Sequence, residues 1–212
     1  MFKNIKKDDA RLYGKEESMP YTIEHKAATR ERIVASGRKL FNRNGFAQVT
    51  IEQIMMDADL TRGGFYHHFD SKEQLFTEVV ARYVTCNPLA IEAAAGGSEY
   101  GNARFVARRL VDLYLSDQVF DDVTQHCPLY ALPSDAQNLG DASREAYTDL
   151  IRGMSQVFRL ALADRHDGDC RAQAVIAMCV GGMVLARTTT DAALRKSLRA
   201  SAHAQAVRML EE

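Results

Sequence analysis

The chain has 212 residues, of which 46% are hydrophobic and 26% charged, enough for one or two compact domains with a sizeable core. Its four cysteines are scattered without a CxxC pair, which argues against a disulfide framework or a zinc site and fits a reducing cytoplasm. The sequence shows no signal peptide and no apolar run of about 18 residues, so we expect a cytoplasmic protein with no membrane span.

Charge is unevenly distributed, although the net charge is only −1. The segment from Lys26 to Gln74 holds eight lysines and arginines against six aspartates and glutamates, a net of +2, which leaves −3 for the remainder. So small an excess does not by itself prove nucleic-acid binding. The near-neutral total argues against a non-specific architectural nucleic-acid protein, because such binding needs many cations.

Residues 1–24 carry mixed charge without an apolar period, and Gly14 and Pro20 interrupt them, so we predict a poorly ordered N-terminal arm. Two interpretations of this arm stay open. Translation can start at Met19, which makes the preceding residues an extension. Alternatively, the three lysines among the first seven residues add contacts to phosphates.

A first helix is predicted over residues 28–43, where apolar residues recur on one face and Asn44-Gly45 supplies a C-terminal cap. A second is predicted over residues 50–58. It begins with a capping box, because Gln53 follows the Thr50 cap at the reciprocal spacing.

A third, short helix follows a turn at Asp59-Leu60, with Thr61 as its cap. Phe65 and Phe69 fall on one face and point to a core. The opposite face points to water and holds Arg62, Gly63, Tyr66 and His67.

Such a solvated face suits a recognition helix in a major groove. Arginine reads guanine edges, glycine admits close backbone approach, and tyrosine, histidine and lysine reach phosphates. A helical hairpin with a polar exterior is the alternative, and helix lengths alone do not separate the two.

Ser71 is predicted to cap a long helix that reaches about Cys86, with Lys72 in its first turn, where backbone N–H groups point outward. This helix would connect the short helices mechanically to the rest of the chain.

From Leu89 to Glu212 the pattern is helical throughout. Long helices are predicted at 103–115, 142–164, 170–189 and 192–210, and a segment broken by Pro133 and Gly140 lies between the first two. We therefore expect an all-α fold of about nine helices. It comprises an N-terminal three-helix helix-turn-helix domain (25–86) and a C-terminal helical ligand-binding and dimerisation bundle (87–212).

The last two predicted helices are rich in small residues, which allow close helix approach. We expect this hairpin to pair with its copy in a homodimer, because helix-turn-helix readers engage two half-sites about 34 Å apart. Packing within one subunit is the alternative role of these small residues, which include Gly181, Gly182, Ala186 and Ala202.

The stretch from Thr29 to Val80 resembles the N-terminal domain of the TetR/AcrR family of bacterial transcriptional regulators. The matching residues read RERIVASGRKLFNRNGFAQVTIEQI and LTRGGFYHHFDSKEQLF, about a quarter of the chain. The resemblance implies a homodimeric repressor that binds a palindromic operator in double-stranded DNA. It also implies release by a small-molecule effector held in the C-terminal domain.

The resemblance places DNA contacts at eight motif positions: Thr50, Thr61, Arg62, Gly63, Tyr66, His67, His68 and Lys72. Thr50, at the helix cap, is expected to contact a phosphate, and Arg62 and Gly63 are expected to approach bases. Tyr66, His67 and Lys72 are expected to contact phosphates. His68 is alternatively a buried histidine that holds the recognition helix.

An effector pocket is expected inside the C-terminal bundle. Its interior offers few charges, so the expected ligand is apolar or aromatic. Ligand binding would move the helix 71–86 and change the spacing of the two helix-turn-helix domains (the reading heads) of the dimer. Taken singly, each candidate fits ordinary core packing better than ligand contact. The candidates are Phe105, Tyr114, His126, Tyr130, Met154, Phe158 and Met178.

An alternative replaces the ligand by a thiol, as in an electrophile or redox sensor. Cys127 lies beside His126 and before Pro128, where a helix start can lower the thiol pKa, although a buried inert cysteine is the commoner case. An enzyme is not expected, because no metal-spaced cluster, phosphate loop or Gly-x-Ser-x-Gly elbow occurs. We accordingly predict no cofactor and no metal.

Overall fold

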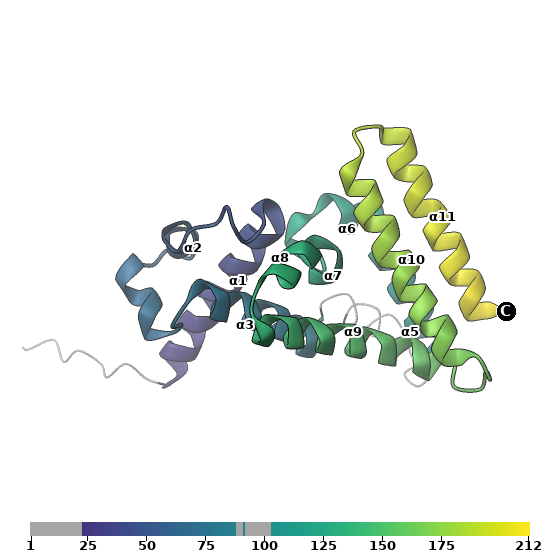
Figure 1. Cartoon of the computed structure of the whole chain (residues 1–212), viewed down its shortest axis with the longest axis horizontal. Helices are drawn as coiled ribbons and strands as arrows, with labels where there is room; N and C mark the ends of the chain where they lie inside the picture. The colour runs from purple at the N-terminus through teal and green to yellow at the C-terminus, as the bar shows by residue number, and fades with distance from the viewer. Residues whose placement is uncertain (1–22, 88–90, 92–102) are drawn as a thin grey trace, which may run out of the picture.

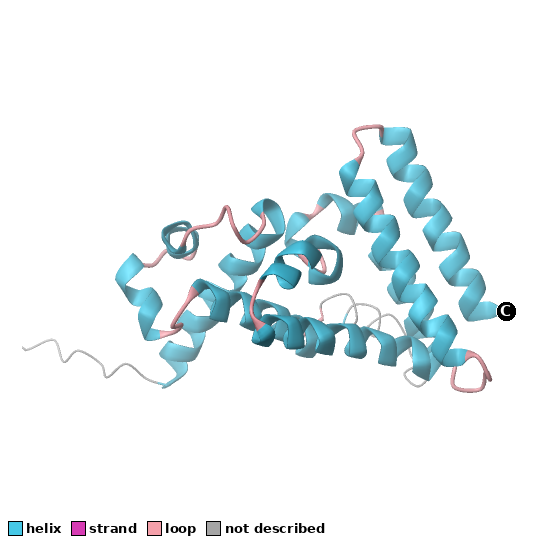
Figure 2. Cartoon of the chain, in the orientation of Figure 1, coloured by secondary structure: helices cyan, strands magenta, loops and turns pink. Residues whose placement is uncertain are grey.

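The computed structural model of the protein describes residues 23–87, 91 and 103–212 (Figure 1). Helices joined by turns make up these residues, with no strand among them (Figure 2). The predicted all-α class is therefore confirmed. The predicted N-terminal arm lies outside the described residues, apart from Ile23 and Glu24.

The N-terminal region contains three α-helices and one 3₁₀ helix, in the order α1 (Ile23–Asn44), α2 (Ile51–Asp57), η1 (Arg62–His67) and α3 (Lys72–Thr85). Helix α1 begins five residues before its predicted start, because its first turns are exposed and carry no apolar period that could reveal them. It ends as predicted: Gly45 has a φ of +75°, and its N–H donates to the carbonyl of Phe41 at 2.8 Å.

An aromatic core holds these helices together. The ring centroids of Phe41, Phe46 and Phe76 lie 5.5 to 5.8 Å apart, which brings together α1, the loop after it and α3. Phe65 and Phe69 anchor η1 to the same core. The small domain therefore forms around aromatic residues from α1, η1, α3 and the connecting segments, while α2 contributes Ile54 and Met55.

The described residues of the C-terminal region form four long helices and four short ones that lie between the first two long ones (Figure 1). The long helices correspond to those predicted, whereas α6 and η2 were not predicted. Both prolines of the broken segment lie in first helical turns, where the missing N–H costs nothing. The elements are α5 (Ala103–Tyr114), α6 (Asp117–Asp121), η2 (Val123–Gln125), α7 (Pro128–Ala131), α8 (Pro133–Asn138), α9 (Asp141–Ala161), α10 (Gly168–Thr188) and α11 (Ala192–Glu211).

Helix α9 connects the two regions. It packs against α3 at one end and against α5 and α10 further along. Helices α10 and α11 lie side by side at the end of the molecule away from α2, as Figure 1 shows. The N-terminal helices therefore contact the C-terminal region through α3 against α9 and through α1 against η2.

Helix α10 corrects one expectation drawn from hydropathy. It contains an 18-residue window with a mean hydropathy of 1.4, so by length and composition it is apolar enough to cross a membrane. Here it packs against α9 and α11 and buries Ala172, Val175, Cys179 and Met183. Its apolarity is weak evidence for a membrane, since a core helix of a bundle has the same composition.

Candidate nucleic-acid interface

The N-terminus of α2 is fixed by the predicted capping box. The Thr50 hydroxyl accepts a hydrogen bond from the backbone N–H of Gln53 at 3.2 Å, and the Gln53 side-chain oxygen accepts one from the Thr50 N–H at 2.8 Å. Thr50 is exposed, so its position at the helix start is open to a phosphate.

Polar contacts attach α2 to α1. The Ser36 hydroxyl donates to the Ile54 carbonyl at 2.9 Å and to the Asp57 carboxylate at 2.8 Å. Lys39 approaches the same carboxylate at 2.5 Å. Hydrogen bonds from Lys39 and Ser36 lower the pKa of Asp57, against the effect of burial. These contacts fix the first helix of the pair relative to α1.

The predicted recognition helix is a 3₁₀ helix, η1, rather than an α-helix. Thr61 occupies its N-cap position, but its side chain makes no capping hydrogen bond, so that detail of the prediction is wrong. Phe65 and Phe69 are 0% and 2% exposed. The opposite face is exposed as predicted, and comprises Arg62, Gly63, Tyr66 and His67.

Arg30 of α1 holds the end of η1. Its guanidinium donates to the carbonyl oxygen of His68 and lies 4.1 Å from the centroid of the Phe69 ring. The His68 ring is half-buried, and its Nδ1 has no hydrogen-bond partner among the described residues. Burial, followed by the charges of Lys26 and Arg30, lowers the pKa of His68. His68 thus attaches the helix through its carbonyl rather than through its ring.

Lys72 has a structural role in this conformation. Its ammonium group donates to the carbonyl oxygens of Phe46 at 2.8 Å and Val49 at 2.7 Å, and lies 4.2 Å from the centroid of the Phe46 ring. Desolvation lowers the pKa of Lys72. The side chain therefore fixes the loop that precedes α2, and a phosphate contact from it stays a prediction.

Three of the seven candidate effector residues meet at one place. The ring centroids of Tyr114 and Tyr130 are 5.4 Å apart, and those of His126 and Tyr130 are 5.1 Å apart. All three side chains are buried. Together they form a polar and aromatic cluster where α5 meets the segment that starts α7.

The other four candidates do not form a ligand-sized pocket with them. Met154 and Phe158 line, with Tyr114, a cavity of about 10 Å³, which is about the size of one water molecule. Phe105 and Met178 are half-buried and do not line this cavity. The predicted apolar pocket is therefore closed in this conformation.

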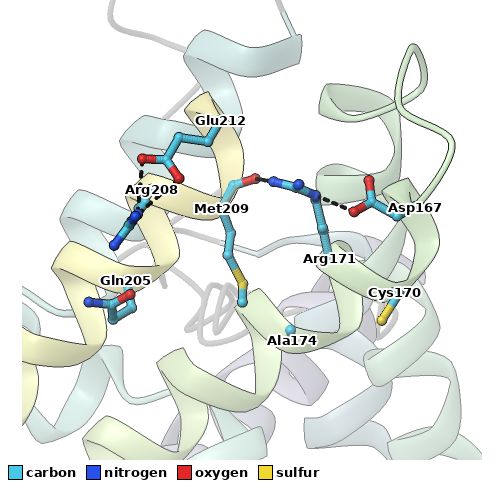
Figure 3. Close-up of a pocket in the computed structure, with 8 residues that line it drawn as sticks. All are labelled: Asp167, Cys170, Arg171, Ala174, Gln205, Arg208, Met209 and Glu212. Carbon is cyan, nitrogen blue, oxygen red and sulfur yellow. Dashed lines mark hydrogen bonds and ion pairs between the residues drawn. The ribbon is translucent and has the colours of Figure 1, made fainter.

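A larger hollow, of about 370 Å³, lies between the start of α10 and the end of α11 (Figure 3). Its charges are paired with one another. Arg171 donates to the Asp167 carboxylate at 2.8 Å and to the Met209 carbonyl at 3.3 Å, and Arg208 pairs with Glu212 at 2.9 Å. This open hollow contains none of the candidate effector residues and offers a ligand no unpaired arginine.

Sequence reasoning missed the polar contacts between α1 and the segment after α6. The Asn42 amide donates to the carbonyls of Val123 at 3.3 Å and His126 at 3.0 Å, and Arg38 donates to the carbonyl of Thr124 at 2.5 Å. Asn42 is 2% exposed in the last turn of α1. A polar residue at a helix end fits solvent equally well, so the sequence carried no signal of this contact.

The fold and the site together define a helix-turn-helix DNA-binding protein. The described residues include no group of three or more His, Cys, Asp or Glu side chains that could hold a metal ion. What the head does present is an exposed polar face of η1 on an aromatic core, beside a capped α2 fixed to α1.

Residues 33–79 match the family described as bacterial regulatory proteins, tetR family. Among curated relatives, the HTH-type transcriptional repressor NemR of Escherichia coli K12 is 25% identical over 174 residues, which cover 75% of this chain and 84% of NemR. The HTH-type transcriptional repressor BepR of Brucella suis is 25% identical over 170 residues, covering 74% of this chain and 79% of BepR.

Solved structures share the fold. The crystal structure of the reduced form of E. coli NemR superposes with a TM-score of 0.67 at 21% identity, covering 85% of this chain and 96% of that one. A TetR transcriptional regulator from Chloroflexus aurantiacus gives a TM-score of 0.71 at 22% identity, covering 90% and 98%. The chain therefore carries a match to the tetR-family DNA-binding domain at residues 33–79 and is similar in sequence and fold to TetR-family transcriptional regulators.

Proposed function

We propose that the protein is a homodimeric repressor that acts in the bacterial cytoplasm, binds a palindromic operator through two reading heads and is released by a small-molecule effector. Residues 25–86 form the reading head and 87–212 the effector and dimerisation domain. One observation carries this proposal: the exposed polar face of η1 is anchored from beneath by Phe65 and Phe69. Rigid support of exposed contact residues is what sequence reading requires.

The proposed contacts divide by chemistry. Arg62 reaches base edges, where one bidentate pair discriminates by about 1–3 kcal/mol. Tyr66, which is 59% exposed, and His67 reach phosphates, as does the cap at Thr50. Lys72 is likewise proposed to reach a phosphate, and Thr61 and His68 to border the same contact surface.

Operator selection from random duplex DNA, followed by affinity measurements at stated salt, tests this assignment. Arg62→Ala is expected to weaken operator binding at least tenfold and to relax sequence preference. Arg152→Ala is a matched control, because this exposed arginine lies on α9 and pairs with acidic side chains of its own helix. Equal affinity of the two variants would remove Arg62 from the interface.

Gly63 offers a sharper test of close backbone approach. A Cβ added there meets nothing within 4 Å, so Gly63→Ala leaves the free protein unstrained. The same change at Gly64 meets Met55 at 3.5 Å, an ordinary contact on the side of the core. Weaker operator binding by Gly63→Ala but not by Gly64→Ala is expected, since only the first methyl group would face DNA.

The homodimer is proposed to form through α10 and α11. The two neighbouring glycines of α10 have different surroundings: a Cβ on Gly182 would lie 2.7 Å from the Ala202 Cβ, whereas a Cβ on Gly181 meets nothing within 4 Å. Gly182 therefore serves packing within the subunit. Gly181 belongs to an outward stripe with Ala177 and Leu185, which is 54% exposed.

An apolar groove adjoins this stripe and extends the proposed contact. Its volume is about 220 Å³, and Ile151 beside it is 43% exposed. Apolar surface that is exposed on one protomer and continuous across two helices is typical of an oligomer interface. The groove lies over α7, α9 and α10 and is lined by Leu129, Tyr147, Ile151, Ser155, Gln173, Ile176, Ala177 and Val180.

Light scattering on purified variants tests the interface. Gly181→Arg is expected to yield a folded monomer that has lost tight operator binding, because two half-sites then bind independently. Ala163→Arg, at an exposed position in the turn after α9, should remain dimeric. A dimeric Gly181→Arg protein would place the interface elsewhere.

The thiol-sensor alternative finds no support in the geometry. Cys127 is fully buried, and burial raises the pKa of its thiol to about 11, so little thiolate exists at neutral pH. Cys86 and Cys170 are the exposed thiols of the described residues. In the native protein, a thiol-reactive dye should therefore label these two rapidly, and equally fast labelling of Cys127 would revive the alternative.

A further inference from the structure

Buried polar atoms without partners gather where the reading head meets the C-terminal bundle. Among the described residues, no hydrogen-bond partner reaches the hydroxyls of Tyr83, Tyr114 and Tyr130, the Nδ1 of His126 or the Nε of Arg38. The four aromatic side chains are at most 3% exposed. We call these five residues the junction cluster.

The junction cluster is one place and not a scatter of separate atoms. The Tyr114 and Tyr130 rings meet edge to face at 5.4 Å, and His126 lies 5.1 Å from Tyr130. The Arg38 guanidinium lies 5.4 Å from the centroid of Tyr83. The hydroxyls of Tyr83 and Tyr114 lie beside the Cys127 thiol and that of Tyr130 beside the Cys127 backbone, without forming hydrogen bonds of normal geometry.

A buried hydroxyl that has given up water without gaining a partner destabilises a fold. Phenylalanine would fill the same volume without this cost, yet three neighbouring positions carry tyrosine. Buried polar groups that lack protein partners in native structures are satisfied by ordered water or by a ligand. The concentration of such groups at one junction therefore marks a binding site.

The chemistry of the cluster indicates what it binds. His126 Nε2 lies 3.0 Å from the Phe120 carbonyl, so in the neutral ring the proton is on Nε2 and Nδ1 is an acceptor. The cluster contains this one acceptor and four donors, which are the three tyrosine hydroxyls and the Arg38 Nε–H. A second guanidinium, that of Arg187, lies 5.7 Å from the centroid of Tyr130. Two guanidinium groups face one nearby carboxylate, that of Asp122, so donors and positive charge are in excess within walls made of aromatic rings.

We propose that the junction cluster is the effector site, and that it takes a small aromatic compound whose carbonyl or carboxylate oxygen accepts hydrogen bonds from the tyrosine hydroxyls. This inference rests on the proposed effector-released repressor and names its ligand class. It narrows the expectation of an apolar or aromatic ligand, since the aromatic rings cover the ligand's apolar part and the hydroxyls bind its oxygen.

The location connects the site to DNA binding. Tyr83 is on α3, whose first turn carries Lys72 and thereby fixes the loop before α2. Arg38 and Asn42 are on α1 and donate to backbone carbonyls of the segment that holds His126. A ligand among these side chains contacts both helices that carry the reading head. It shifts their position to the extent that it binds one arrangement better than the other.

Matched small probes test the ligand class on the full-length wild-type protein. Acetophenone and ethylbenzene have nearly the same shape, but only acetophenone carries a carbonyl oxygen; benzoate adds a negative charge. Acetophenone and benzoate are expected to raise Tm, whereas ethylbenzene is not.

Two tyrosine variants locate the effect. Tyr114→Phe is expected to weaken acetophenone binding about tenfold, the loss of one hydrogen bond to the ligand. Tyr147→Phe is the matched control, because its hydroxyl already donates to the Leu129 carbonyl at 2.7 Å, and it should bind the probe like wild type. Circular dichroism confirms that both variants fold.

Three results would overturn the proposal: equal responses to acetophenone and ethylbenzene, no response to any of the three probes, or unchanged acetophenone binding by Tyr114→Phe. Each would mean that ordered water alone satisfies the cluster. Failure of the operator hypothesis is separable, because probe binding is measured without DNA. Arg62→Ala should lose operator binding and keep probe binding, whereas Tyr114→Phe should keep operator binding and lose its response to acetophenone.

Discussion

The reading head and the junction cluster use aromatic and polar side chains in opposite ways. In the head, Tyr66 and Arg62 stand in water while Phe65 is buried beneath them, so each residue type occupies its ordinary environment. At the junction, Tyr83 and Tyr114 are buried with their hydroxyls unpaired. The reading head is therefore stable without DNA. At the junction, the unpaired hydroxyls destabilise the fold, and a bound molecule can remove this penalty by forming hydrogen bonds with them.

The largest change in stability is expected for a substitution in the core of the reading head. Phe76 is 0% exposed and contacts Phe41 and Phe46 at ring distances of 5.8 and 5.5 Å. Phe76→Ala should lower the free energy of unfolding by about 3–5 kcal/mol, through lost burial and the cavity left behind. Urea denaturation measures this loss, and Leu160→Ala, at a position 58% exposed, should change stability by less than about 0.5 kcal/mol. Similar losses in the two variants would contradict the aromatic core of the head.

The next largest changes in stability are expected for substitutions of Gly181 and Gly182 in α10. Gly182→Ala places a methyl group 2.7 Å from the Ala202 Cβ and should cost about 1–3 kcal/mol through overpacking between α10 and α11. Gly181→Ala meets open space and should stabilise the protomer by about 0.5–1 kcal/mol, because alanine loses less backbone entropy in a helix. Urea denaturation of both variants measures these changes, and effects of the same sign would contradict the contrast between a packed Gly182 and an open Gly181.

The head was predictable because its signals are local. The capping box at Thr50, the alternation of Phe65 with exposed neighbours and the glycine after α1 each follow from a spacing of a few residues. The sequence could not show that η1 is a 3₁₀ helix and not an α-helix, because Phe65 lies on the buried face with either helical period. The long helices of the bundle were likewise readable from their apolar period.

The junction was not predictable, for a physical reason. Tyr114 and Tyr130 could be listed as candidate residues, but burial of their hydroxyls depends on contacts with Tyr83 and Arg38, which lie far away in sequence. Tyrosine satisfies an apolar pattern whether or not its hydroxyl finds a partner. The partner of Lys72 was hidden in the same way, since a lysine in a first helical turn ordinarily faces water.

Tyrosine variants without any ligand compare a satisfied hydroxyl with an unsatisfied one. Tyr147→Phe removes a hydrogen bond to the Leu129 carbonyl and should cost about 1 kcal/mol. Tyr114→Phe removes a buried hydroxyl that has no protein partner, so it should stabilise the free protein by about 1 kcal/mol, the desolvation penalty that it relieves. The measurement is the midpoint of urea unfolding at constant m-value. A larger loss for Tyr114→Phe than for Tyr147→Phe would show that the Tyr114 hydroxyl is strongly bonded in the free protein.

The smallest effect expected is a pH dependence that originates at the junction. Burial lowers the pKa of His126, and the charges of Arg187 and Arg38 lower it further, against the opposing hydrogen bond to Phe120. As pH falls below about 6.5, the ordinary histidine value, the unfolded chain takes up a proton that the folded protein resists. Stability is therefore fully present above that pH and declines as pH falls from it toward the lower, folded-state pKa. His126→Gln should flatten this decline, while the same change at exposed His166 should leave it intact; parallel pH profiles for wild type and His126→Gln would show that His126 does not resist protonation at the junction.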